Sequence, residues 1–220
     1  SNIEISASQV SFTWKKLDIR LPIGGSYAVM NALAAITAAS ELGIPDDRIV
    51  TGCASVQTVP GRFESVPNDA DIDVVIDFAH TPEALAGLLV CAREITRAGL
   101  TVVFGCGGDR DNAKRPLMGD IASRGADIVI VTSDNPRGED PELIIAEVLS
   151  GVVVNHATVS SIVNRENAIE SAILGAKHGD MVVIAGKGHE TTQEIGGVMT
   201  ASSDVAIAAN ALRVREEKTK

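Results

Sequence analysis

Asparagine, arginine and aspartate side chains are grouped in the segment Asp134-Asn135-Pro136-Arg137, whose residue types could bind an amino acid. The segment lies between an apolar run at 128–131 and a helix start at Asp140-Pro141, which places it after a buried strand. Open α/β sheets bind ligands at the carboxyl ends of their strands. An arginine can hold a carboxylate through two parallel hydrogen bonds, and a carboxylate can hold an ammonium group. An ordinary turn explains the same letters, with Asn135, Pro136 and Gly138 serving backbone geometry and Arg137 solvated.

Three other polar segments follow predicted strands in the same way. They are Asp77-Phe-Ala-His80, Gly105-Cys-Gly-Gly-Asp-Arg110 and Gly186-Lys-Gly-His-Glu190. Because the carboxyl ends of parallel strands meet at one edge of a sheet, we expect all four segments to converge on one site.

Two common phosphate-binding motifs are absent from these segments. The third glycine of a dinucleotide motif GxGxxG would fall at position 110, which is Arg, and no GxxxxGK[ST] loop occurs in the sequence. If the protein uses ATP, the loop that holds the phosphates is therefore not in this sequence.

Several other polar residues have more than one interpretation. His80 and His189 match no metal-binding spacing, so hydrogen bonding or nucleotide contact is favoured over metal ligation. Lys114 and Lys187 are either phosphate contacts or solvated side chains. Arg62 could pair with Glu64 or reach a nucleotide held between two domains.

The composition favours an α/β protein. The 220 residues are 45% hydrophobic but only 3% aromatic, so the core is built from Val, Ile, Leu and Ala, as in parallel strands covered by helices. A net charge of −10 argues against nucleic acid or an anionic membrane as the main partner. An anionic small ligand is still compatible with this charge, and Arg110, Lys114 and Arg115 form a candidate basic cluster.

The cysteines and the absence of sorting signals indicate a reducing cytoplasm. Cys53, Cys91 and Cys106 are odd in number and widely spaced, so neither a disulfide framework nor a CxxC metal site is available. We expect Cys91 to be a small core residue, whereas Cys106, in a glycine-rich loop, could be exposed. No apolar run of about 18 residues and no signal pattern at the start of the sequence is found.

The hydrophobic periodicity divides the chain near Pro60-Gly61. The first part has strands at 10–14 and 17–21 and helices at 27–42 and 46–56, an incomplete core that resembles the end of something larger. Beyond it, strands at 74–78, 101–104, 127–132 and 181–185 alternate with helices that begin at Thr81-Pro82, 115, Pro141 and 166. A hairpin at 191–200 and a last helix from 203 or 204 follow. This alternation predicts an α/β fold with a mostly parallel, doubly wound, Rossmann-like sheet.

Five sequence blocks resemble the Mur ligases of peptidoglycan synthesis, and most of all the branch that adds meso-diaminopimelate. They are GRFE at 61–64, DFAHTPEAL at 77–85, FGCGGDRDNAKRPLMG at 104–119, SDNPRGEDP at 133–141 and AGKGHE at 185–190, and they occur in the family's order. The segment 22–45 resembles the end of the family's central ATPase domain. The resemblance implies that 1–59 is the carboxyl-terminal part of that domain and that 60–220 is the amino-acid-binding domain.

The resemblance also implies an ATP- and Mg²⁺-dependent amide ligase. ATP would phosphorylate the D-glutamate side-chain carboxylate of UDP-N-acetylmuramoyl-L-alanyl-D-glutamate, and the amine of meso-diaminopimelate would attack the acyl phosphate. The matching positions that would hold meso-diaminopimelate are Arg110, Asp134, Asn135, Arg137, Gly186 and Glu190. Those on the nucleotide side would be Asn31, Arg62, Asp77 and His80, and no residue of this sequence would be a metal ligand.

The resemblance assigns a role to each main contact. Arg137, assisted by Asn135, would bind the distal carboxylate, while Glu190 and the Gly186 carbonyl would bind the distal ammonium. L-lysine lacks that carboxylate, so Arg137 favours diaminopimelate over lysine. Two alternatives remain, namely the same scaffold serving lysine and a stand-alone amino-acid-binding module without catalysis.

The sequence departs from the family pattern in two respects. The family's Phe-Asn-x-x-Asn motif is Tyr27-Ala28-Val-Met-Asn31 here, so one expected nucleotide contact is lost at Ala28. The UDP-sugar domain, the phosphate loop and the carbamylated-lysine region have no counterpart in the sequence. We therefore expect a fragment that has no ligase activity by itself, and whose partners include the amino-terminal and central domains of the same protein.

Overall fold

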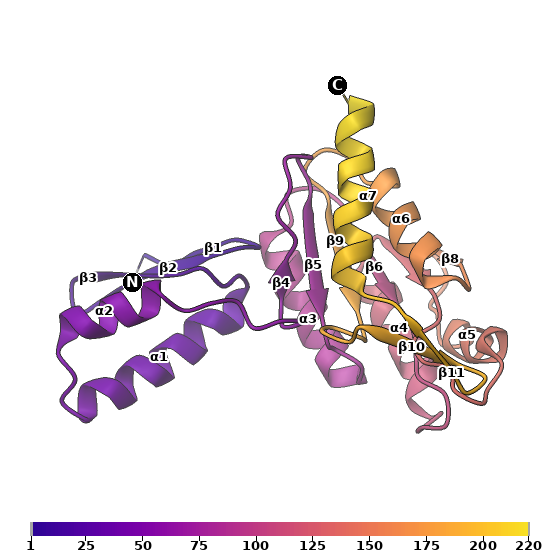
Figure 1. The fold of residues 1–220 in the computed structure, drawn as a ribbon, viewed down its shortest axis with the longest axis horizontal. Coiled ribbons are helices and arrows are strands. Elements are labelled where there is room, and N and C mark those ends of the chain that lie inside the picture. Colours follow the sequence, from indigo (N-terminus) through magenta and orange to yellow (C-terminus); the bar gives the residue numbers. More distant parts are fainter. Residues whose placement is uncertain (1, 220) are drawn as a thin grey trace.

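The structure is a computed structural model that describes residues 2–219, and it has two parts (Figure 1). The first part is an antiparallel sheet of order β1-β2-β3 with two helices. Its elements are β1 (Glu4–Ile5), β2 (Val10–Trp14), β3 (Leu17–Leu21), α1 (Ser26–Glu41) and α2 (Asp46–Ala54). Apolar side chains of β2, β3, α1 and α2 form its small core. Met30 and Leu42 are nevertheless 68% and 81% exposed, so this part leaves large apolar side chains uncovered.

The second part is built around a six-stranded sheet of order β4-β5-β9-β6-β7-β8. All neighbours are parallel except β4, which pairs antiparallel with β5. The strands are β4 (Glu64–Ser65), β5 (Asp73–Asp77), β6 (Leu100–Phe104), β7 (Ile128–Val131), β8 (Thr158–Ser161) and β9 (Met181–Ala185). Every residue of β6 and β9 is buried, as expected for parallel strands covered on both faces.

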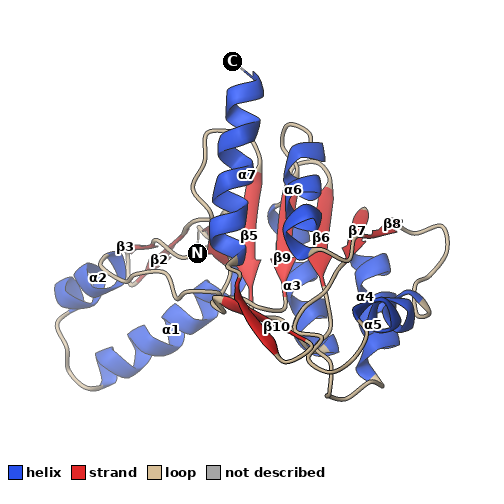
Figure 2. Ribbon diagram, turned by 45° about the vertical axis from the view of Figure 1, so that its right-hand side comes forward, coloured by secondary structure: helices blue, strands red, loops and turns tan. Residues whose placement is uncertain are grey.

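Helices cover both faces of this sheet (Figure 2). One core contains side chains of α3 (Pro82–Ile95), α4 (Lys114–Gly125) and α5 (Pro141–Leu149), and the other contains those of α6 (Arg165–Gly175) and α7 (Asp204–Thr219). The antiparallel hairpin of β10 (Thr192–Ile195) and β11 (Val198–Ala201) lies outside the sheet. The predicted mostly parallel, doubly wound α/β fold is confirmed.

Two side-chain caps end the loops that carry polar residues. Thr81 Oγ1 accepts a hydrogen bond from Ala84 N at 3.3 Å, and Asp140 Oδ1 accepts one from Glu142 N at 2.8 Å. Each cap is followed by a proline in the first turn, whose fixed φ suits that position. The loops after β5 and β7 therefore have fixed ends.

The predicted elements are found within about two residues of their expected limits, but three strands were not predicted. The most important is β8, whose sequence TVSS is largely exposed and lacks an apolar run. It forms because its main chain pairs with β7 at the edge of the sheet. Among residues 2–219, no helix combines the length and the apolar character needed to cross a membrane.

Candidate functional site

A cavity of about 400 Å³, which we call the strand-end cavity, lies at the carboxyl ends of β5, β6, β7 and β9. All four polar segments identified in the sequence contribute to its lining, so their predicted convergence is confirmed. Of the residues proposed for the amino acid, it brings together Arg110, Asp134, Asn135, Arg137, Gly186 and Glu190.

A second cavity of about 630 Å³, the seam cavity, lies between the two parts of the chain. Asn31 of α1, Arg62 and Asp77 line it together with apolar side chains such as Tyr27 and Val59. Three of the four residues expected on the nucleotide side therefore share one cavity. The fourth, His80, lines the strand-end cavity instead.

Phe78 lines the strand-end cavity and contacts a residue of the seam cavity. Its ring lines the strand-end cavity, and the Arg62 guanidinium, which lines the seam cavity, lies 5.0 Å from the ring centroid. The rings of His80 and His189 lie against Phe78 with centroids 4.7 and 5.5 Å away. Phe78 thus contacts residues that line each of the two cavities.

Asp77 anchors the main chain at two points. Its Oδ2 accepts a hydrogen bond from Phe63 N and its Oδ1 accepts one from Ala79 N, both at 2.8 Å. Burial raises the pKa of Asp77, and the two backbone hydrogen bonds and Arg62 oppose that rise. Asp77 therefore connects the segment that follows Pro60-Gly61 to the end of β5.

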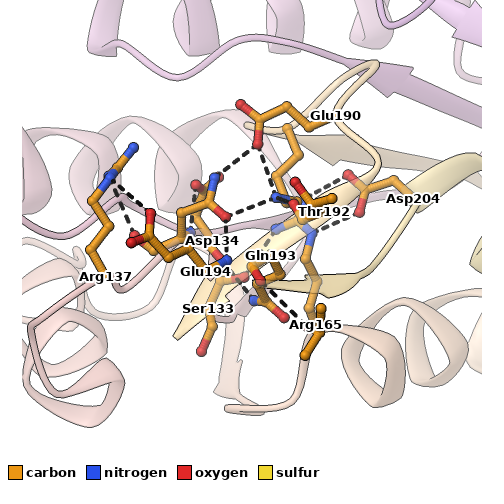
Figure 3. Close-up of polar contacts among 12 residues, drawn as sticks. Ser133, Asp134, Arg137, Arg165, Glu190, Thr192, Gln193, Glu194 and Asp204 are labelled. Atoms are coloured by element: carbon orange, nitrogen blue, oxygen red, sulfur yellow. Dashed lines mark hydrogen bonds and ion pairs between the residues drawn. The ribbon is translucent and has the colours of Figure 1, made fainter. Parts of the chain in front are cut away.

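The β10–β11 hairpin holds Arg137 in an uncommon backbone conformation. Arg137 has φ +53°, a left-handed value that is unusual for a side chain with a Cβ. Its N–H donates to Glu194 O at 3.1 Å, and its carbonyl accepts from Gly196 N at 2.7 Å. The Arg137 side chain is 25% exposed, and its guanidinium donates through Nη1 to Gly108 O at 2.7 Å. The loop and the hairpin therefore both hold Arg137, and Figure 3 shows its side chain beside that of Glu194, whose Oε2 lies 3.9 Å from Arg137 Nε.

Lys187 is neither solvated nor placed to contact a phosphate, so both interpretations of this residue were wrong. Its side chain is 0% exposed. Nζ donates to Asn135 Oδ1 at 3.2 Å, to Glu190 Oε2 at 3.0 Å and to Thr192 O at 2.7 Å. The sequence offered one signal for this role, because Lys187 and Glu190 are three residues apart in a strand-end loop.

Glu190 is held as a carboxylate at the cavity. Burial raises its pKa, but hydrogen bonds from Lys187 and Asn135 and the charge of Arg137 outweigh burial and leave the pKa lowered. Oε2 accepts from Asn135 Nδ2 at 2.8 Å as well as from Lys187. Figure 3 shows the other carboxylate oxygen pointing away from these two donors. A half-exposed carboxylate of this kind can bind an ammonium group.

A buried ion pair lies next to the loops that follow β7 and β9. The sequence analysis did not predict this pair. Arg165 Nη2 lies 2.7 Å from Asp204 Oδ2, with side chains 1% and 0% exposed. The same guanidinium donates to Ser133 O at 3.3 Å and Ala185 O at 3.0 Å. Those carbonyls immediately precede the polar segments after β7 and β9, so the pair fixes two of the four strand ends.

The predicted basic cluster is only partly available to a ligand. Arg110 is exposed at the strand-end cavity. Lys114 Nζ donates to His80 O at 2.8 Å. Arg115 is 0% exposed and its Nη1 lies 2.9 Å from carboxylate oxygens of both Glu139 and Glu147, so its inclusion in the cluster was wrong. These two carboxylates neutralise the charge that an anionic ligand would need.

Arg62 does not pair with Glu64, which corrects one of the two interpretations of Arg62. Glu64 Oε2 instead accepts a hydrogen bond from Gly61 N at 2.7 Å. Arg62 is left exposed at the seam cavity beside Phe78.

Cys106 is buried, contrary to the expectation that it could be exposed, and we predict that it is unreactive. It is 2% exposed, and burial raises its pKa to about 11. At pH 8 roughly one thiol in a thousand would be the reactive thiolate. Iodoacetamide should therefore modify the partly exposed Cys53 first, and Cys106 only in urea or as the pH approaches 11, as followed by mass spectrometry. Labelling of Cys106 at the rate of Cys53 in the folded chain at pH 8 would contradict this.

Clusters of His, Cys, Asp and Glu side chains commonly bind metal ions in proteins. Within residues 2–219, no group of three or more His, Cys, Asp or Glu side chains is arranged to hold a metal ion.

Comparison with known proteins places this site in a family. The family model described as "Mur ligase, glutamate ligase domain" matches residues 61–188. The UDP-N-acetylmuramoyl-L-alanyl-D-glutamate–2,6-diaminopimelate ligase of Syntrophomonas wolfei is 44% identical over 213 residues, covering 96% of this chain and 44% of the relative. The Clostridioides difficile protein of the same name is 46% identical over 194 residues, covering 88% of this chain and 40% of the relative.

Solved structures agree with the sequence comparison. A UDP-N-acetylmuramoyl-L-alanyl-D-glutamate–2,6-diaminopimelate ligase has a TM-score of 0.77 at 37% identity, covering 98% of this chain and 45% of that structure. A folylpolyglutamate synthase from Thermotoga maritima, at 20% identity and a TM-score of 0.62, shares the fold; the match covers 84% of this chain and 43% of that structure. The chain spans less than half the length of the curated relatives it matches. The family match and the similarity of fold together show that the chain belongs to the Mur ligase family.

Proposed function

We propose that the chain is the carboxyl-terminal part of an ATP-dependent ligase that adds meso-diaminopimelate to the D-glutamate side-chain carboxylate of UDP-N-acetylmuramoyl-L-alanyl-D-glutamate. The names of its relatives support this reaction. The observation that carries the proposal is the strand-end cavity, in which the Arg137 guanidinium and the Glu190 carboxylate line the same 400 Å³ space. A ligand end that bears both a carboxylate and an ammonium matches these two charges.

The distal end of meso-diaminopimelate is such a group. Arg137 binds its carboxylate with help from Asn135, and Glu190 and the Gly186 carbonyl bind its ammonium. Arg110 adds a further charge-assisted contact, and Asp134 shapes the loop by accepting a hydrogen bond from Asn135 N at 2.7 Å. The distal carboxylate is what distinguishes this ligand from L-lysine, with which Arg137 would keep only its contacts inside the protein.

The seam cavity suits the nucleotide. Its apolar lining can bury a base, while Asn31, Arg62 and Asp77 supply polar contacts at its edge. Ala28, which replaces an asparagine of the family, lines the same cavity and leaves one such contact out. His80 would act from the other side of Phe78, near the amino acid.

The reaction proposed for these cavities passes through an acyl phosphate. ATP phosphorylates the D-glutamate carboxylate, the free amine of meso-diaminopimelate attacks the acyl phosphate, and the amide forms as phosphate leaves. The contribution of this chain is to hold the amine beside the activated carboxylate, which replaces a bimolecular encounter by a positioned one. Mg²⁺ is implied by the family resemblance, but we assign it no ligand and no step in this chain.

The two parts of the chain take different roles in this proposal. Residues 1–59 form the carboxyl-terminal part of a central ATPase domain, and residues 60–220 form the amino-acid-binding domain. The exposed Met30 and Leu42 support a contact of the first part with further domains of the same protein. We propose neither nucleic acid nor a membrane as a partner. We propose that the reaction takes place in the cytoplasm.

A chimera tests the proposed reaction. The chain would replace the matching carboxyl-terminal region of the Syntrophomonas wolfei relative, to which it is 44% identical. We expect ADP release that requires ATP, Mg²⁺, the UDP-dipeptide and meso-diaminopimelate together, and none from the isolated chain, which lacks the phosphate loop. Release that depends equally on L-lysine would favour the lysine-adding alternative. A folded chimera that binds diaminopimelate but never turns over would favour a binding module without catalysis.

A further inference from the structure

Lys187 is buried next to the strand-end cavity, and the proposed function assigns it no role. Lys187 is among the largest fully buried side chains, and its Nζ has three acceptors at 3.2 Å or less. A lysine ammonium has three N–H donors and no acceptor. All three donors are therefore used inside the protein, and none is left for a ligand.

The contacts of Lys187 determine the orientation of the Asn135 amide. Asn135 Oδ1 accepts from Lys187 Nζ at 3.2 Å and from Glu194 N at 3.0 Å. Because both neighbours are donors, the amide atom that faces them must be the oxygen. The Nδ2 group is then directed to the other side, where it donates to Glu190 Oε2 at 2.8 Å.

The same lysine determines how Glu190 meets a ligand. Lys187 and Asn135 both bind Oε2, so this oxygen is committed to the protein. Figure 3 shows Oε2 joined to the network while the second oxygen projects away from it. Lys187 and Arg137 are the cations that lower the pKa of Glu190 and so stabilise its ionised form, while burial opposes them.

We propose that Lys187 is a positioning residue for the selection of the amino acid. It fixes the amide of Asn135 and holds Glu190 as an oriented carboxylate, so that Oε1 is presented to the ammonium of a diamino acid. The inference rests on the proposed function, because it specifies how the amino-acid site is prepared before the ligand arrives. Lys187 acts through Asn135 and Glu190 without touching the ligand.

The first test needs no ligand. In a chain labelled with ¹³C at the glutamate carboxyls, the titration of Glu190 is compared between wild type and Lys187→Met. We expect the midpoint to rise in the variant and the Asn135 side-chain amide resonances to shift or broaden. Glu190 with a lowered pKa stabilises the fold above its unfolded pKa and loses that contribution as the pH falls through its folded pKa. The variant, in which the folded pKa is higher, should therefore lose less stability than wild type when the pH is lowered through this range.

The second test measures selection. At pH 7 we expect Lys187→Met to weaken meso-diaminopimelate binding roughly tenfold. Its affinity should fall further between pH 7 and 5, where wild type stays nearly constant. Lys177→Met is the matched control, because Lys177 is exposed and precedes β9 at the opposite end of the sheet. This control should leave the titration, the amide resonances and the affinity unchanged.

Further variants keep the test decisive if Lys187→Met does not fold. The double variant Lys187→Met/Glu190→Gln also removes the carboxylate that Lys187→Met leaves without its ammonium partner. It should therefore be more stable than the single variant. Lys187→Gln retains a donor without the charge, and it should also raise the Glu190 midpoint. The inference is overturned if folded variants leave the Glu190 titration and the Asn135 amide as in wild type.

The two proposals fail in different ways. If wild type binds meso-diaminopimelate and the Lys187 variants bind it equally well at pH 5 and 7, the inference fails and the proposed function stands. If wild type does not bind it although Glu190 titrates differently in Lys187→Met, the proposed ligand is wrong and the positioning of Glu190 by Lys187 stands.

Discussion

Replacing Arg137 with alanine is expected to weaken binding of meso-diaminopimelate by roughly 100-fold, or 3 kcal/mol, while binding of L-lysine changes little. The guanidinium lies at the strand-end cavity and is the group assigned to the distal carboxylate. Removing it leaves that carboxylate desolvated without a partner, and lysine has no such carboxylate to lose. Isothermal titration of both ligands against wild type and variant measures the change in preference.

A lysine at the same position provides the control for charge. Arg137→Lys keeps a cation but cannot make two parallel hydrogen bonds, so it should recover only part of the lost affinity. Because Arg137 Nη1 also donates to Gly108 O at 2.7 Å, the stability of each variant should be measured alongside. Equal losses for the two ligands in a well-folded Arg137→Ala chain would show that the guanidinium does not recognise the distal carboxylate.

Replacing Asp204 with asparagine is expected to destabilise the chain more than any surface substitution. Breaking a buried ion pair costs about 3–5 kcal/mol, because one charge is left buried without its partner. Arg165 and Asp204 are 1% and 0% exposed, so solvent cannot replace the lost carboxylate. For a chain of this size we expect the melting temperature to fall by roughly 6–20 °C, which differential scanning calorimetry can follow.

Two comparisons isolate the buried charge as the cause. Glu217→Gln removes a pair with Arg213 whose side chains are both 63% exposed, and its cost should be below about 1 kcal/mol. Arg165→Met/Asp204→Leu removes both buried charges and should be more stable than Asp204→Asn. If Asp204→Asn lowered the melting temperature no more than Glu217→Gln, the ion pair would not support the strand ends.

The central architecture could be predicted from the sequence because periodicity and capping are local. The apolar runs that became β5, β6, β7 and β9 and the Thr81 and Asp140 caps are all readable within a few residues. Their order implied a parallel sheet, which brought the four polar segments to one edge. The strand β8 was missed because its stability comes from pairing with β7 and not from its own apolar content.

The burial of the charged side chains could not be predicted, because most of their partners are distant in the sequence. Arg165 pairs with Asp204, 39 residues away, and Arg115 pairs with Glu139 and Glu147. From composition alone, an arginine or lysine is expected at the surface. The carboxylates that Arg115 and Lys187 contact depend on the fold, so the sequence alone indicates ligand contacts or solvated groups for these two residues.

The most direct test of the amino-acid site is a titration of this chain with meso-diaminopimelate, and separately with L-lysine, followed by backbone amide chemical shifts. We predict saturable shifts for meso-diaminopimelate that are confined to the loops containing Arg110, Asn135, Arg137, Gly186 and Glu190, and little response to L-lysine. Equal responses to both ligands, or saturable shifts that map to a different face of the sheet, would contradict the assignment of this cavity.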